Sequence, residues 1–194
     1  MRVRYQIFML PKSHIHLGRR LSNLIEENYE NYFILGNVTP DFAIEHKIKK
    51  HEYLHLKKWF LNYFEKTLDM NIGNKRLAYY RLGVITHYLA DFFCRPHNDN
   101  TIKKKYLKHF SYEKKLHDEL LKYQLDCNVS GNISLLDIDK TLDENYNKYI
   151  ETEYNISNDL YFISVITTNI VSTANEYILE NTSSSIYCPE KDLL

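Results

Sequence analysis

The chain has 194 residues, enough for one domain with a substantial hydrophobic core. Lysine plus arginine and aspartate plus glutamate each number 25, so the formal net charge is zero and gives no electrostatic basis for binding duplex nucleic acid or an anionic membrane. The cysteines at positions 94, 127 and 188 form no CxxC pair, and no apolar run reaches the length of a signal-peptide core or a membrane span. We therefore expect reduced thiols and a cytoplasmic protein.

Apolar residues recur at helical spacing along most of the chain. This spacing predicts helices over about 13–25, 52–68, 75–93, 101–125, 135–153 and 157–180. Glycine, asparagine and proline predict a turn and an irregular segment within 33–43, a break over 95–100 and a loop over 127–134. The expected fold is all-α: a single-domain multi-helix bundle over residues 1–182, followed by a loose polar tail, 183–194.

The nine histidines all lie in the first 117 residues, and two of them have a carboxylate four residues later. His87 and Asp91 share one face of the most apolar predicted helix, where a carboxylate is costly unless it is paired or bound to a cation. His109 and Glu113 repeat this spacing on the next predicted helix, and His97 lies in the break between the two. Helices that carry such pairs can converge on a metal ion inside a bundle.

Each pair taken alone also has an ordinary structural explanation. For His109 and Glu113, a surface hydrogen bond or a satisfied core histidine is the commoner reason for the spacing. For His87 and Asp91, in apolar surroundings, the two interpretations are balanced. The histidines without a partner pattern are expected at the surface or behind the site: His16, His46 and His117.

The string HYLADFFCRPHN, residues 87–98, resembles the signature of the bacterial zinc-dependent phospholipase C family. That family presents its ligands in the order His, Asp, His, HxxxD, His and HxxxE, and residues 13–120 supply this whole order. The matching residues are His14, Asp41, His51, His87, Asp91, His97, His109 and Glu113, with His55 as an alternative to His51.

The resemblance implies a helical fold that holds two or three zinc ions in one buried cleft. By analogy with the family, one ion is held by Asp41, His51, His87 and Asp91, a second by His97, His109 and Glu113, and a third by His14 and Asp91. Imidazole and carboxylate ligands without thiolate are typical of catalytic zinc. The resemblance also implies that Asp41 orients or deprotonates the attacking water.

The function expected from these residues is that of a zinc-dependent phosphodiesterase. The substrate is a phospholipid head-group ester or another phosphodiester, hydrolysed by a metal-activated water. Two alternatives stay open: a single-strand nuclease of the same superfamily, and an intracellular metal-binding or interaction domain without turnover. Duplex nucleic acid is not an expected partner, and no transmembrane segment is expected.

Overall fold

The computed structural model describes residues 10–43, 51–69, 74–98, 106–125 and 137–184. Within these ranges every regular element is helical, which confirms the predicted all-α class. The α-helices are α1 (Pro11–Leu21), α2 (Glu30–Val38), α4 (Tyr53–Leu68), α5 (Lys75–Phe92), α6 (Arg95–Asn98), α8 (Tyr106–Leu120), α9 (Ile138–Glu151) and α10 (Ile156–Ser184). Short 3-10 turns lie beside the first two helices: η1 (Ser22–Leu24), η2 (Glu27–Tyr29) and η3 (Thr39–Asp41).

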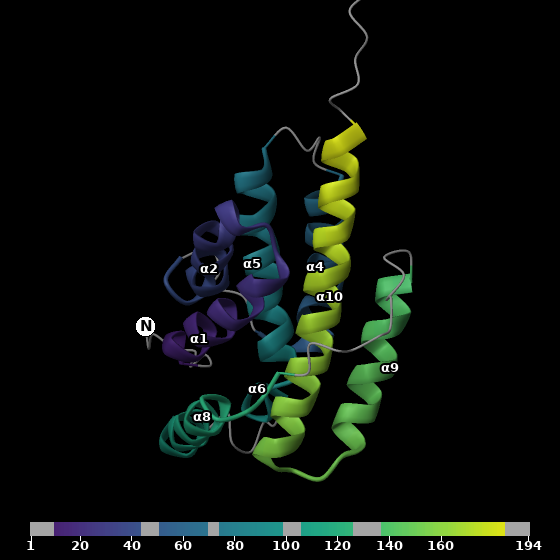
Figure 1. The fold of residues 1–194 in the computed structure, drawn as a ribbon. Coiled ribbons are helices and arrows are strands. Elements are labelled where there is room, and N and C mark those ends of the chain that lie inside the picture. Colours follow the sequence, from purple (N-terminus) through teal and green to yellow (C-terminus); the bar gives the residue numbers. More distant parts are fainter. Residues whose placement is uncertain (1–9, 44–50, 70–73, 99–105, 126–136, 185–194) are drawn as a thin grey trace, which may run out of the picture.

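Helix α5 occupies the centre of the bundle (Figure 1). Helix α2 packs against one side of α5 and α4 and α10 against others, while α6 and α8 lie beyond its carboxyl end. Consequently the residues of α5 from Leu82 to Phe92 are all buried. An apolar sequence on every side of a helix has this outcome, because each face must be covered by a neighbour. At the other end, Asn74 caps α5 by accepting a hydrogen bond from the Leu77 N–H at 3.1 Å.

The outer helices bury the apolar stripes that their periodicity predicts. In α4, Leu56, Phe60 and Phe64 are buried, whereas Tyr63 is half-buried. One hydrophobic cluster runs from Leu17 on α1 to Ile178 on α10. Among the described helices, none combines the length and the apolar character needed to cross a bilayer.

The predicted turn within 33–43 is wrong over its first half, because Glu30–Val38 forms α2 and Thr39–Asp41 forms η3. Gly36 does not form a turn; it lies on the face of α2 that packs against α5, and Gly83 lies on the facing side of α5. A Cβ atom on Gly36 would lie 1.9 Å from the Tyr80 carbonyl oxygen, and one on Gly83 would lie 2.0 Å from the Phe33 carbonyl oxygen. The two glycines therefore allow the backbones of α2 and α5 to touch.

The predicted break at 95–100 contains a helical turn. Helix α5 ends at Phe92, and α6 follows at Arg95–Asn98 with Pro96 in its first turn. Proline is tolerated there because the N–H groups of a first turn have no acceptor within the helix. Helix α10 continues to Ser184, two residues beyond residue 182, where the bundle was expected to end. The predicted loop at 127–134 and residues 185–194 lie outside the described ranges.

The contact between α2 and α5 gives a stability prediction. We expect Gly83→Ala to lower the free energy of unfolding by about 1–3 kcal/mol, because the two backbones must separate to admit the methyl group. Helix propensity alone predicts the opposite, since alanine stabilises a helix interior by about 1 kcal/mol relative to glycine. Urea denaturation followed by far-UV circular dichroism measures the change.

Gly18→Ala is the matched control. Its Cβ would meet the side-chain amide nitrogen of Asn37 at 2.9 Å rather than a backbone atom, so we expect a smaller loss. Unchanged stability of Gly83→Ala would contradict the tight backbone contact.

Candidate metal centre

The eight residues expected as ligands all lie in the interior of the bundle. They are contributed by α1, η3, the segment before α4, α5, α6 and α8. His55, the alternative to His51, does not join them: its side chain is 56% exposed and contacts Glu52 at 3.0 Å. Spacing fits both histidines, and burial favours His51.

A first group combines α1 with α5. His14, His87 and Asp91 each offer a nitrogen or oxygen atom within 4.8 Å of the others. His14 Nε2 lies 3.4 Å from Asp91 Oδ1, and His87 Nε2 lies 3.4 Å from Asp91 Oδ2. The His14 and His87 rings stack with centroids 3.8 Å apart, so both imidazoles reach the same carboxylate from one side.

A second group combines α6 with α8. His97, His109 and Glu113 likewise offer atoms within 4.8 Å of one another. His109 Nε2 lies 2.6 Å from Glu113 Oε1 one turn along α8, and His97 Nε2 approaches the same oxygen at 3.6 Å. The contact between His109 and Glu113 is therefore buried. It is not the surface hydrogen bond that their spacing alone would also allow.

The two groups meet at His97. Its Nε2 atom is 3.6 Å from Asp91 Oδ1 and 3.6 Å from Glu113 Oε1. Side chains from four helices thus form one continuous cluster with Asp91 near its middle.

Asp41 and His51 lie at the edge of the first group. His51 Nδ1 is 2.5 Å from Asp91 Oδ2, and Asp41 Oδ1 is 4.0 Å from His87 Nε2. The expected set of Asp41, His51, His87 and Asp91 is therefore brought together. Two of its members, His87 and Asp91, also share with His14 the group whose ligand atoms all lie within 4.8 Å of one another, although the family analogy assigned His14 to a different ion.

Asn37 orients the first group, a role that the sequence patterns do not predict. The Nδ1–H of His87 donates to the Asn37 carbonyl oxygen at 3.0 Å, which directs Nε2 into the cluster. The Asn37 side-chain amide donates to the His14 carbonyl oxygen at 2.8 Å. The sequence feature that relates to this role is the position of Asn37 next to Gly36, because the contact of Gly36 with α5 brings the Asn37 carbonyl group to His87.

His117 lies behind the site, one of the two places expected for it. It is buried on α8, and its Nδ1 lies 3.0 Å from the Ser13 hydroxyl. Ser13 precedes His14, so this hydrogen bond joins the helix of the first group to that of the second. His16 is half-buried, and His46 lies outside the described residues.

Burial and charge set the protonation of the first group. Burial by itself would raise the pKa of Asp91, but the neighbouring His97 and His87 outweigh it and hold the pKa well below its usual range. Burial lowers the pKa of His14 to about 3 and that of His51 to about 4. Burial would also lower the pKa of His87, but the Asp91 and Asp41 carboxylates outweigh it and raise that pKa. The ionised Asp91 and the neutral His14 and His51 are in the protonation states that a divalent cation requires, and His87 would have to lose its proton when the cation binds.

The second group differs in its carboxyl group. Burial raises the pKa of Glu113 to about 7, against the opposing effect of His97. Near neutral pH this side chain is therefore poised between its acid and its carboxylate.

Several buried polar atoms of the cluster fit a metal ion. His87 Nε2, His97 Nε2 and Glu113 Oε2 make no hydrogen bond with any described residue. A buried polar atom without a partner costs about 1–3 kcal/mol, and coordination would remove that cost. Imidazole nitrogens and carboxylate oxygens are ligands that zinc accepts, so the residues present fit this metal.

The fold and the site together define a helical protein built around a buried cluster of side chains suited to bind metal ions. Residues 13–156, well over half of the chain, match the model of the family described as zinc-dependent phospholipase C. The chain therefore belongs to the zinc-dependent phospholipase C family, as the resemblance predicted. Zinc is accordingly its cofactor, and the two buried groups could hold two ions. No curated protein and no solved structure matches the chain.

The different exposure of His51 and His55 gives a prediction. We expect His51→Ala to weaken zinc binding at the first group about 10- to 100-fold, because it removes a histidine in direct contact with Asp91. His55→Ala is the control and should bind zinc like the wild type, since its ring is exposed. Elemental analysis after dialysis against graded chelators measures both, and the reverse order of effects would contradict the placement.

The raised pKa of Glu113 predicts that zinc binding releases a proton. Below about pH 7 the metal-free side chain is protonated, and a carboxylate ligand must lose that proton, so zinc affinity should fall as pH decreases. Calorimetry near pH 6 in buffers of different ionisation enthalpy counts the protons released.

Glu113→Gln separates this proton from any other. Comparison with the wild type should show about one proton fewer released in the variant. Equal release by the two proteins would show that Glu113 is already ionised.

Proposed function

We propose that the protein is a zinc-dependent phosphodiesterase that hydrolyses the head-group ester of a phospholipid. The observation that carries the proposal is the junction at His97, which lies 3.6 Å from a carboxylate oxygen of each group. Adjacent groups of this kind can hold two cations that act on a single phosphate. Membership of the zinc-dependent phospholipase C family supports the same chemistry.

The proposed roles follow from the placement of the side chains. His14, His87 and Asp91 would hold one ion with Asp41 and His51 beside them, and the second group would hold the other. When bound, zinc lowers the pKa of a water molecule and polarises phosphate oxygens. The protein's part is to fix these ligands inside a buried network, so that the phosphodiester is oriented without rearrangement.

Asp41 is the proposed general base. It lies at the edge of the first group and is 7% exposed, compared with 0% for Asp91. A carboxylate in this position can accept a proton from the attacking water as the oxygen–phosphorus bond forms, while the leaving ester oxygen takes a proton from solvent water. The bond broken joins phosphorus to the glycerol-side oxygen, giving a diacylglycerol and a phosphorylated head group.

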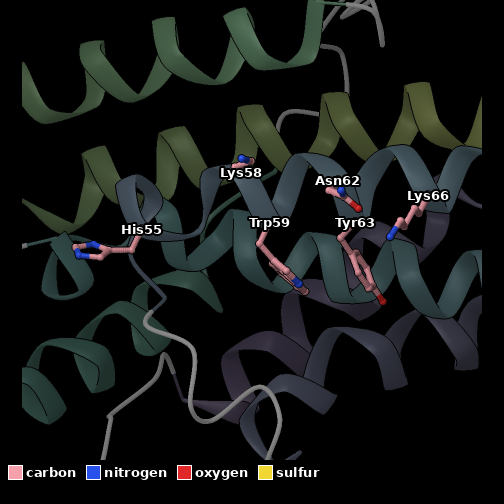
Figure 2. A pocket seen from close by; sticks show the side chains of 6 residues that line it. All are labelled: His55, Lys58, Trp59, Asn62, Tyr63 and Lys66. Atoms are coloured by element: carbon pink, nitrogen blue, oxygen red, sulfur yellow. The ribbon is translucent and has the colours of Figure 1, made fainter.

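A hollow along α4 favours single-strand nuclease activity as a second candidate (Figure 2). Trp59 is half-buried and stacks on Tyr63 with centroids 5.1 Å apart, and Lys58 and Lys66 line the same hollow. The Tyr88 ring contacts both Trp59 and His51, with centroids 5.0 and 4.8 Å away. An aromatic surface flanked by lysines can stack a base and contact phosphates.

Two substrates separate the candidates. We expect zinc-loaded protein to hydrolyse a chromogenic phosphocholine ester, to stop when chelated and to recover with zinc. Asp41→Asn should lower kcat about 10²- to 10⁴-fold, the usual contribution of a general base. His55→Ala should keep wild-type activity.

The outcome with single-stranded DNA decides between the enzymes. Cleavage of DNA alone, lost in Trp59→Ala, would favour the nuclease. Bound zinc without turnover of any phosphodiester would reject both and leave a metal-binding domain.

A further inference from the structure

A buried carboxylate outside the metal cluster joins three helices. Asp159, in the first turn of α10, is 0% exposed. Its Oδ2 atom accepts hydrogen bonds from the Arg95 N–H and the Tyr112 hydroxyl, both at 2.9 Å. Its Oδ1 atom accepts one from the Tyr149 hydroxyl at 2.8 Å. Three donors for one carboxylate far exceed what a helix-start aspartate usually receives.

The two donors to Oδ2 belong to the segments that carry the second group. Arg95 lies two residues before His97 in α6, and Tyr112 directly precedes Glu113 in α8. One oxygen atom therefore joins the two chain segments whose side chains must meet. The donor to Oδ1 differs, because Tyr149 lies on α9, which contributes none of the described cluster residues.

Helix α6 needs such support. It spans four residues, too few for a helix to be stable without tertiary contacts. The Arg95 guanidinium donates to the Tyr149 and Thr152 carbonyl oxygens at 3.2 and 2.9 Å, and the Asn98 amide donates to the Phe92 carbonyl oxygen at 2.8 Å. Among the described residues, Asp159 Oδ2 is the one side-chain acceptor that receives hydrogen bonds from both this turn and α8.

We propose that Asp159 is a positioning residue for the second zinc ion, holding His97 and Glu113 at the separation that coordination requires. Tyr112 is its partner on α8. The inference rests on the proposed function in one respect, namely that the second group binds zinc. Metal sites tolerate ligand displacements of only about 0.5 Å, so loss of the shared acceptor should weaken that ion selectively.

A pair of tyrosine variants tests the proposal. Tyr112→Phe and Tyr149→Phe each remove one hydroxyl hydrogen bond to the same carboxylate, but only Tyr112 lies on a ligand-bearing helix. We expect Tyr112→Phe to weaken the second zinc about 10-fold and Tyr149→Phe to leave it unchanged. Competition with a chromogenic zinc chelator measures both ions, and the first ion serves as an internal reference.

Asp159→Asn supplies the second test. Alone it should weaken the second zinc about 10- to 100-fold. Combined with Glu113→Gln, which removes a ligand of that ion, it should add no further loss, because coupled residues give non-additive effects. If Asp159→Asn does not fold, the tyrosine pair still decides the question.

Distinct results would overturn the inference. Equal loss of zinc in the two tyrosine variants, or no loss in either, would leave Asp159 with a purely structural role. If the wild-type protein binds one zinc ion, held by the first group, the inference fails because the second group binds no metal. If it binds no zinc at all, the proposed function fails as well. Two bound zinc ions without phosphodiester turnover would reject only the proposed function.

Discussion

The direct contact between the backbones of α2 and α5 is the constraint on which the first metal group depends. Because Gly36 and Gly83 carry no side chain, α2 lies close enough for the Asn37 carbonyl oxygen to accept the Nδ1–H of His87. The Asn37 amide reaches the His14 backbone on α1 from the same place. A packing contact between two helices therefore sets the orientation of one imidazole and the position of the helix that bears the other.

The site is held together by groups that would be unfavourable in an ordinary core. Asp91 is fully buried, and its charge is stabilised by the imidazoles around it rather than by solvent. Buried atoms such as His97 Nε2 and Glu113 Oε2 stay without hydrogen bonds to described residues, at a cost of about 1–3 kcal/mol each. Local rules of stability are broken where function requires it, and the apolar cluster around α5 compensates for the loss.

Helical periodicity and four-residue spacing predicted most of the fold and the two His–carboxylate pairs, since both signals are local. The resemblance added the remaining candidates in order. Neither could distinguish His51 from His55, because burial depends on how the segment before α4 enters the bundle. Gly36 was assigned to a turn because its contact with α5 is made by residues far along the chain. Asn37 acts partly through its carbonyl group, which every residue possesses, and Asp159 looks like any acidic residue at a helix start.

The sequence position of Asp159 has a consequence for the order in which the protein is assembled during synthesis. His14, His87 and Asp91 lie within the first half of the chain, and all of them have been made before α10 exists. The hydrogen bonds that join α6 to α8 through Asp159 form only after the last described helix has docked. The residues of the half beside α1 are thus all present before α10 is made, whereas the link between α6 and α8 has to wait for it.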